Sequence, residues 1–512
     1  MQKAKGRWKK CLTQMNKVCE ARWFPFSFVI VAALFLLFFS PSTSPLFTFE
    51  GLDSAVFKSM GQAILKGKVL YRDIFDNKGP ILYLANALGL LIAGRFGIFL
   101  LQIVGLSFAL LFMYKMARLF CGELWSLLSL AVSLLLLSVF FEEGNQCEEW
   151  MLYGFAPVLY LSMKWYCDLQ TDKARAFDRR RMIRDCLFYG LFFGYALFIR
   201  PNDAVGFAGG QCLAVAVVTL LNKKWNSIYC LVMGFVAGTI IVATPIVLWF
   251  LLHDALLDLW NGMFGVNMGY VGGVLSFLTL PIVKIPLLLC VLTMCVVAYC
   301  RGGKTFLVMV ACPLCLMFLL IGHQMFYHYY IVFIPYVTTG LACARKVPVP
   351  TAVLGAMVIF LSQPMDYDGR HAPLIRQIRH QFSGRNAGLH LNQEQQSLLR
   401  EGELLVSHIP EEERDFVWND ISSEYQLFPI FPHNGIVQCN RQVFDFGDNC
   451  VYQKYIHQTL SSAIELPLWV VSSSQIHDPL LADDCSPYCM VSKTEHYTLY
   501  HLMPSAVYGV AR

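Results

Sequence analysis

The sequence predicts a polytopic α-helical membrane protein with a small soluble α/β domain at its C-terminal end. Three observations support this fold class. The 512-residue chain is 56% hydrophobic and 15% charged, whereas a soluble domain carries about 25% charged residues. Apolar runs of roughly 15 to 25 residues, long enough or nearly so for the hydrocarbon core, recur between Phe24 and Gln363. From Pro364 onward the composition is that of a globular domain.

These composition changes predict a transmembrane domain at residues 1–363 and a soluble domain at residues 364–512. Lysines precede the first apolar run and no small-residue cleavage site follows it, which predicts an uncleaved anchor with a cytoplasmic N-terminus. We predict about eleven spans, at residues 24–40, 97–114, 122–141, 150–166, 186–200, 204–221, 226–252, 276–300, 304–322, 328–343 and 347–363.

The stretch Ile81–Gly94 is apolar, but we do not count it as a span. If it crossed the membrane, Lys115 and Arg118 would lie outside and the later basic loops would break the positive-inside rule. If it lies along the outer surface, every later basic cluster is cytoplasmic. An odd number of spans then places the C-terminal domain outside the cytoplasmic (inner) membrane. Because topology accounts for the basic residues, we expect no nucleic-acid partner.

The first outer segment, Pro41–Arg95, is charged and is predicted to hold two interfacial helices. Apolar residues recur at helical spacing over Ser54–Leu65, and Gly67 suits the end of that helix. The second helix follows Pro80. Two acids in this segment have structural interpretations: Asp53 stands where an N-cap residue belongs, and Asp76 precedes a Gly-Pro turn.

Two motifs in this segment resemble a known family. They are Glu50-Gly-Leu-Asp53-Ser-Ala-Val-Phe and Gly67-Lys-Val-Leu-Tyr-Arg72-Asp73-Ile-Phe-Asp76-Asn-Lys78-Gly-Pro-Ile-Leu-Tyr. In sequence, order and membrane position they resemble the first periplasmic loop of bacterial C-type glycosyltransferases, in the group related to aminoarabinose transferases and protein O-mannosyltransferases. The resemblance is strong over about residues 45–120 and covers the rest of the membrane domain in outline.

The resemblance implies a fold like that of the C-type glycosyltransferases and a catalytic carboxylate in this loop. Asp53 matches the acid of the family, and Ser54 stands where many relatives carry a second acid. The implied donor is a sugar on a polyprenyl phosphate, used at the outer face of the membrane. The substrate-binding candidates in this loop are Glu50, Arg72, Asp73, Asp76 and Lys78.

Polar residues at other predicted outer ends of spans are further candidates. Four carboxylates, Glu142, Glu143, Glu148 and Glu149, lie in a loop without lysine or arginine, where they are expected to position an acceptor, bind a divalent cation or hydrogen-bond the first loop; the first three are substrate-binding candidates. The alternative is a solvated acidic turn. Arg200 closes a span on the side where arginine is disfavoured, which predicts an anionic partner such as Glu142, Glu148 or a lipid phosphate.

Two more candidates lie at the outer ends of later spans. Lys284 falls about eight residues into its span, roughly 12 Å deep, where a cation normally faces a polar cavity; snorkelling to the headgroups is the alternative. His328 and Tyr329 belong to a His-Tyr-Tyr element that resembles one in relatives. We expect His328 to bond a sugar or pyrophosphate oxygen, whereas Tyr327 and Tyr330 suit an aromatic belt.

The C-terminal domain gives weaker signals. Asn392–Ser407 predicts a helix, and short strands are predicted at Phe416–Trp418, Leu468–Val471 and Tyr497–His501. No nucleophile elbow, metal motif or phosphate loop is present in this part of the sequence. The expected role is acceptor recognition or packing on the outer face.

The predicted activity is inverting transfer of a hexosyl or pentosyl group from a polyprenyl-phosphate donor to a lipid, glycan or protein acceptor. Asp53 is the expected general base, and Arg72, Lys78, Arg200 and Lys284 are the cations expected to stabilise the departing phosphate. Membrane lipid is an expected partner. No definite cofactor is predicted, and a divalent cation is left open. The alternative is a transporter or flippase of lipid-linked sugars, which predicts inverted repeats and midplane charges that the sequence does not display.

Overall fold

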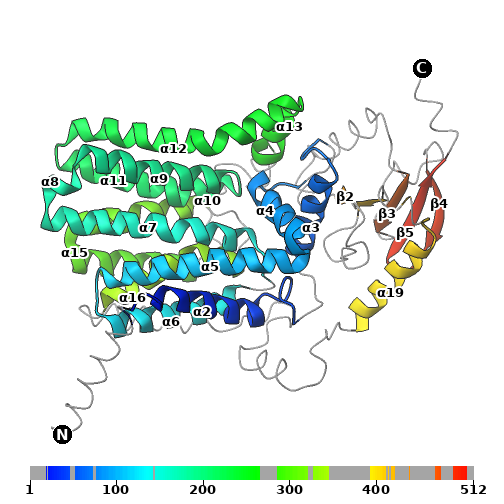
Figure 1. The fold of residues 1–512 in the computed structure, drawn as a ribbon, viewed down its shortest axis with the longest axis horizontal. Coiled ribbons are helices and arrows are strands. Elements are labelled where there is room, and N and C mark those ends of the chain that lie inside the picture. Colours follow the sequence, from blue (N-terminus) through cyan, green and yellow to red (C-terminus); the bar gives the residue numbers. More distant parts are fainter. Residues whose placement is uncertain are drawn as a thin grey trace, which may run out of the picture. The chain divides into compact units, whose positions relative to one another are not determined.

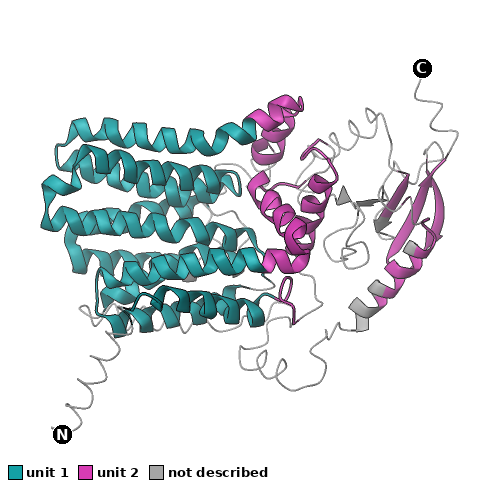
Figure 2. Ribbon diagram, viewed as in Figure 1, with its two compact units in different colours: residues 1–40, 100–247, 272–385 teal, residues 41–99, 248–271, 386–512 magenta. Residues whose placement is uncertain are grey.

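The computed structural model describes residues 19, 21–46, 52–72, 76–141, 144–265, 285–320, 327–344, 393–410, 413, 417–420, 437–438, 468–473 and 488–503 (Figure 1). The chain divides into two compact units (Figure 2). Unit 1 comprises residues 1–40, 100–247 and 272–385, and unit 2 comprises residues 41–99, 248–271 and 386–512. The predicted boundary between residues 363 and 364 lies outside the described residues and stays a prediction.

Unit 1 is a bundle of helices, of which α5 and α12 each continue for a few residues into unit 2. Within it α6 packs against α16, α11 against α15, and α7 against α9. The helical elements are α2 (Phe24–Phe39), α5 (Arg95–Arg118), α6 (Glu123–Phe140), α7 (Cys147–Thr171), α8 (Lys173–Ala176), α9 (Arg179–Leu197), α10 (Pro201–Ala204), η1 (Val205–Gly209), α11 (Gly210–Leu221), α12 (Trp225–Leu252), α15 (Ile285–Leu320), η5 (Tyr327–Phe333) and α16 (Ile334–Ala344).

Five described helices are long and apolar enough to cross a membrane: Arg95–Arg118, Glu123–Phe140, Pro201–Leu221, Trp225–Leu252 and Leu287–Leu320. The apolar helices α2 and α4 (Pro80–Ala93) are shorter. The predicted class, a polytopic helical membrane protein, is therefore confirmed. The number of spans and the side of each terminus stay predictions.

The helix α15 consists of two helices that meet at Gly303. This glycine has φ 64° and ψ −156°, a region of conformational space that is open essentially to glycine alone. The break agrees with the predicted division between spans 276–300 and 304–322. Residues 266–284, and with them the start of the first of these spans, lie outside the described residues.

In unit 2, the first outer segment forms two packed helices, α3 (Leu52–Leu65) and α4. Gly61 allows their backbones to approach, because a Cβ atom there would lie 2.7 Å from the backbone nitrogen of Ala87. Gly67 ends α3 as predicted: it has φ 80°, the Gly67 N–H donates to Ile64 O, and the Lys68 N–H donates to Ala63 O. This pair of bonds is the Schellman motif. Unit 2 also contains α13 (Leu256–Trp260) and η2 (Asn261–Gly265).

The C-terminal segment combines one helix, α19 (Gln393–Ser407), with a five-stranded sheet. The strands are β1 (Val417–Asp420), β2 (Val437–Gln438), β3 (Trp469–Ser473), β4 (Tyr488–Lys493) and β5 (Tyr497–Leu502), in the order β2-β1-β3-β5-β4. β1 pairs in parallel with β2 and β3, whereas β5 is antiparallel to β3 and β4. The predicted helix and three strands are confirmed, and β2 and β4 were not predicted.

Candidate active site

Asp53, the acid that matches the family motif, lies in the first turn of α3 and is half-buried. The helix begins at Leu52, so Asp53 is the second residue of the helix and does not occupy the predicted N-cap position. A carboxylate in the first turn is favoured by the helix dipole. The residue after it, Ser54, is fully buried. The catalytic role of Asp53 stays a prediction.

The turn that leads into α4 is held together by the hydroxyl group of Tyr83. This hydroxyl donates to Asp76 Oδ2 at 2.7 Å and accepts the backbone N–H of Lys78 at 3.0 Å. Asp76 is buried, with 2% of its surface exposed. A buried carboxylate needs such a partner, because a buried polar group without a hydrogen bond destabilises the fold by about 1–3 kcal/mol, and a charged group by more. Asp76 therefore has the structural, turn-forming role that its Gly-Pro context indicated.

Lys78 is fixed from both sides of its backbone. Its N–H is bound by Tyr83, and its carbonyl accepts the hydroxyl of Tyr71 at 2.5 Å. The side chain is half-buried, and its Nζ donates to Asn77 Oδ1 at 2.9 Å. A cation on a backbone held in this way is preorganised, so little conformational entropy is lost when an anion binds.

The chain just before this turn contacts the end of α12 and the residues that follow it within unit 2. Tyr71 has φ 64°, and its ring stacks on Phe250 with 5.8 Å between centroids. Gly262 lies against this ring, where a Cβ atom would come within 2.3 Å. Arg72 is exposed, and its Nη1 donates to His253 O at 2.8 Å.

Two cations that sequence reasoning did not select hold the start of the first outer segment. Lys58 is fully buried, and its Nζ donates to Ser42 O at 2.5 Å. Arg95 donates to Pro41 O and, at 3.3 Å, to Ser44 O. The signal available in the sequence was Lys58 itself, the single charged residue of the predicted helix Ser54–Leu65.

In unit 1, the predicted acidic loop forms a tight turn into α7. Gly144 has φ 77°, and a Cβ atom there would lie 2.0 Å from Ser40 Oγ, so only glycine fits. Asn145 is also left-handed, with φ 59°, and its side-chain Oδ1 accepts the indole N–H of Trp150 at 2.9 Å. This turn places Glu148 and Glu149 in the first turn of α7, where both are fully buried. A solvated acidic turn is therefore wrong for these two residues.

Glu148 forms an ion pair with Arg200, the anionic partner that the sequence predicted for this arginine. Its Oε2 accepts from Cys147 Sγ at 3.0 Å and lies 3.9 Å from Nε2 of His328. The side chain of Arg200 is 13% exposed, and Glu148 is fully enclosed. The ion pair neutralises a carboxylate whose burial alone would be very costly.

Arg200 has further partners in the same place. Its Nη1 lies 3.3 Å from Asp203 Oδ2, and its guanidinium carbon lies 4.1 Å from the centroid of the Tyr329 ring. The cation is therefore shared by two carboxylates and an aromatic face. The structure brings together four of the predicted outer-face residues: Glu148, Arg200, His328 and Tyr329.

Glu149 is a buried carboxylate of the predicted acidic loop that was not selected as a substrate-binding residue. It accepts two bonds from Gln102 Nε2, at 2.8 and 2.9 Å, one from the backbone N–H of Asn145 at 2.8 Å, and one from the hydroxyl of Tyr153. The spacing of Glu149 and Tyr153 by four residues on one helix was the available signal. The polar Gln102 within the apolar run 97–114 was the other.

Several predicted residues lie outside the described residues: Glu50, Asp73, Glu142, Glu143 and Lys284. Their proposed contacts stay predictions. Of the described candidates, Asp53, Arg72, Asp76 and Lys78 belong to unit 2, and Glu148, Arg200, His328 and Tyr329 belong to unit 1.

Neither a protein-family model nor a curated protein sequence matches this chain. Solved structures are similar to it. ArnT from Cupriavidus metallidurans, crystallised with undecaprenyl phosphate bound, is 12% identical and has a TM-score of 0.58, with 95% of this chain and 99% of ArnT covered. AglB, the oligosaccharyltransferase of Archaeoglobus fulgidus in complex with an inhibitory peptide and a dolichol-phosphate, is 13% identical with a TM-score of 0.44, with 88% and 69% covered.

The likeness to ArnT extends over nearly the full length of both chains and establishes the fold. The chain therefore has the fold of ArnT, a helical membrane bundle with a small C-terminal sheet domain, and the expected fold, like that of the C-type glycosyltransferases, is confirmed.

Proposed function

We propose that this protein is a membrane glycosyltransferase that moves a sugar from a polyprenyl-phosphate donor to a hydroxyl or amine on a lipid, glycan or protein acceptor. The observation that carries this proposal is the fold shared with ArnT over 95% of the chain, in combination with the Asp53 and Lys78 motifs of the first outer segment. That ArnT was crystallised with undecaprenyl phosphate supports a lipid-phosphate donor. We place the reaction at the outer face, with inversion at the anomeric carbon.

In this mechanism the acceptor oxygen or nitrogen attacks the anomeric carbon from the face opposite the phosphate. The bond from that carbon to the acceptor forms as its bond to the phosphate oxygen breaks, and the phosphate leaves with the electron pair. Asp53 takes the proton of the acceptor as general base, a contribution of about 10²–10⁴-fold to the rate.

We assign the leaving phosphate to Lys78 rather than to Arg200. Arg200 already pairs with Glu148 and lies 3.3 Å from Asp203, so little of its charge is left for a third anion. Lys78 donates to the neutral Asn77 side chain, and hydrogen bonds at its N–H and carbonyl fix its backbone. Exchange of a neutral acceptor for a phosphate oxygen gives a stronger, charge-assisted bond.

The second polar centre, around Glu148, is proposed to bind the polar part of a substrate. Arg200 would act by holding Glu148 in place. Gln146 Oε1 is buried and has no hydrogen-bond partner among the described residues, and His328 is 8% exposed. Both side chains have hydrogen-bonding capacity that suits sugar hydroxyls.

The test separates donor binding from transfer in the full-length protein in lipid nanodiscs. Undecaprenyl phosphate is the probe for binding, measured by native mass spectrometry. Lys78→Gln should weaken binding at least tenfold, whereas Lys66→Gln, a change in the same segment, should not. Equal binding by the Lys78→Gln and Lys66→Gln proteins would refute the assignment of the phosphate to Lys78.

Transfer is then measured in membranes that supply lipid-linked sugars. Asp53→Asn should abolish transfer while undecaprenyl phosphate still binds. Unchanged transfer by Asp53→Asn would remove this residue as the base. Movement of lipid-linked sugar across the membrane without transfer would favour the flippase alternative over the proposed enzyme.

A further inference from the structure

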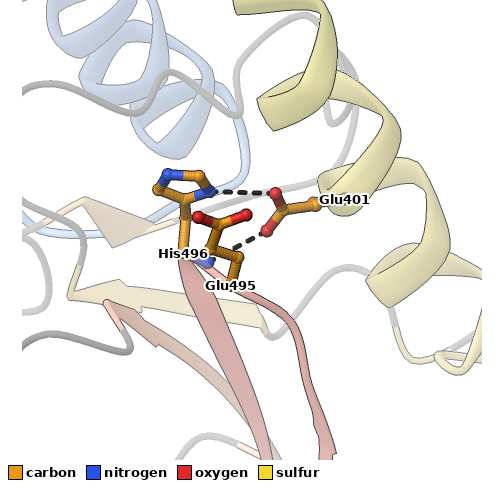
Figure 3. A group of neighbouring side chains, drawn as sticks. All are labelled: Glu401, Glu495 and His496. Carbon is orange, nitrogen blue, oxygen red and sulfur yellow. Dashed lines mark hydrogen bonds and ion pairs between the residues drawn. The ribbon is translucent and has the colours of Figure 1, made fainter. Parts of the chain in front are cut away.

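Helix α19 and the turn between β4 and β5 bring two carboxylates and an imidazole together (Figure 3). Glu401 lies in α19, and Glu495 and His496 lie in the turn. One ligand atom from each residue lies within 4.8 Å of the other two. Ligands about 2.0–2.2 Å from a Zn²⁺ ion lie up to about 4.4 Å apart, so a small movement of the side chains would enclose a cation.

The position of two of these groups is fixed by direct contacts. The backbone N–H of His496 donates to Glu401 Oε2 at 3.0 Å, and its ring Nδ1 lies 2.9 Å from Glu401 Oε1. Both carboxylate oxygens of Glu401 are therefore held against His496.

The charge of the cluster is not compensated by basic side chains. Glu495 is exposed, and within the described part of the chain neither glutamate forms an ion pair with a lysine or arginine. With a neutral imidazole, two carboxylates this close repel each other. A divalent cation would remove that repulsion and satisfy both acids.

We propose that Glu401, Glu495 and His496 form a divalent-cation site that joins α19 to the β4–β5 hairpin. Two carboxylate oxygens and one imidazole nitrogen are a ligand set that Zn²⁺ and Mn²⁺ accept, with water in the remaining positions. Sequence reasoning found no metal motif here because Glu401 and His496 are 95 positions apart. The site does not depend on the proposed transfer reaction.

Mn²⁺ is the probe, because it prefers oxygen and nitrogen ligands over the thiols of this cysteine-rich chain. Binding to the full-length protein in nanodiscs is measured by the loss of the free-ion electron paramagnetic resonance signal. Wild-type protein should bind one Mn²⁺ that Glu495→Gln binds at least tenfold more weakly. Glu403→Gln, a change of an exposed glutamate in the same helix, should bind it as the wild type does.

Glu495→Gln leaves both contacts between Glu401 and His496 in place, so the fold should be retained. A second measurement makes the result independent of that variant. Electron spin-echo envelope modulation of bound Mn²⁺ should show a coupling to a nitrogen nucleus, and this coupling should be lost in His496→Gln. The control is His408→Gln, a change of an exposed histidine that follows α19, which should keep the coupling. Equal binding by Glu495→Gln and wild type, or a nitrogen coupling unaffected by His496→Gln, would overturn the proposal.

Discussion

The turn at residues 76–83 and the entrance of α7 at residues 145–153 solve the same problem, a buried carboxylate, in different ways. In the turn, Asp76 is satisfied by a neutral phenol that also binds the backbone of Lys78. At α7, Glu148 is satisfied by a cation, Arg200. The first arrangement satisfies its carboxylate through a neutral hydroxyl group, and the second uses the charge of an arginine. Charge at a site is therefore not a guide to which cation binds a substrate; the partners of each cation decide that.

The largest expected effect is on the α7 entrance. Arg200→Ala leaves Glu148 buried without its cation and should destabilise the protein by about 3–5 kcal/mol. The readout is the temperature at which the solubilised protein is lost from the monodisperse peak in size-exclusion chromatography. Arg118→Ala removes a more exposed ion pair, with Glu123, and should cost at most about 1 kcal/mol.

If the cost comes from the unpaired carboxylate, a second change should reverse it. Arg200→Met with Glu148→Gln should be more stable than Arg200→Met alone, since the double variant no longer buries an unpaired Glu148 carboxylate, whereas Asp203 loses its arginine in both. A double variant as unstable as Arg200→Ala would show that packing, and not charge, is what Arg200 contributes.

Gly61→Ala tests how closely α3 and α4 must pack to support the turn. The new methyl group would meet the backbone of Ala87 at 2.7 Å, and overpacking of this kind costs about 2 kcal/mol. Gly122→Ala is the matched control, since a Cβ atom there meets nothing within 4 Å. Thermal stability of both variants, measured in the same way, should fall only for Gly61→Ala.

Tyr83→Phe breaks the turn while leaving its packing intact. Loss of the hydroxyl leaves Asp76 and the N–H of Lys78 without this partner and should cost about 1.5 kcal/mol. Because Lys78 then loses one of the bonds that fix its backbone, binding of undecaprenyl phosphate should also weaken. Tyr160→Phe, the control, should change neither the thermal stability nor the binding of undecaprenyl phosphate. If Tyr83→Phe lowered the stability but left lipid binding unchanged, the turn would not be part of the proposed phosphate site.

The smallest effect is expected at the partly exposed pair of Glu401 and His496, whose side chains are 14% and 15% exposed. Glu401→Gln should cost at most about 1 kcal/mol. Since hydrogen bonds lower the pKa of Glu401 in the folded protein despite the opposing effect of burial, its contribution is present above the pKa of the unfolded chain. It is lost as the pH falls through the lower folded pKa.

Hydrogen exchange of residues 393–407 measures this contribution. Exchange, corrected for its intrinsic pH dependence, should rise in wild type below about pH 4 and should be less sensitive to pH in Glu401→Gln. Glu403→Gln should behave as the wild type. An identical pH dependence in wild type and Glu401→Gln would rule out this carboxylate as the titrating group.

Local signals in the sequence were sufficient for features made by neighbouring residues. The apolar spacing of Ser54–Leu65 and the position of Gly67 predicted α3 and its end, and the bounds of the apolar runs 276–300 and 304–322 predicted the division of α15. The anionic partner of Arg200 was also predicted, because arginine is disfavoured at that end of a span. Each of these features depends on the spacing of residues along one helix or on the position of charges relative to the membrane, and both can be read from a single sequence.

Features that depend on how distant segments pack were not predictable. The bonds between Glu149 and Gln102 require the register of α5 against α7, which no local pattern fixes. The link from Tyr83 to Asp76 depends on the path of the turn. β4 was missed because its exposed positions mix polar and apolar residues, with no clear alternation.

The break at Gly303 has a consequence for how substitutions are tolerated. Between the helices that meet there, the structure has no loop, only one glycine with a positive φ. No linker is therefore available to absorb a change of backbone conformation at this point. A Cβ atom at position 303 meets no atom within 4 Å, so the cost of a side chain there would come from the backbone alone, and relief of that strain would change the angle between the two helices.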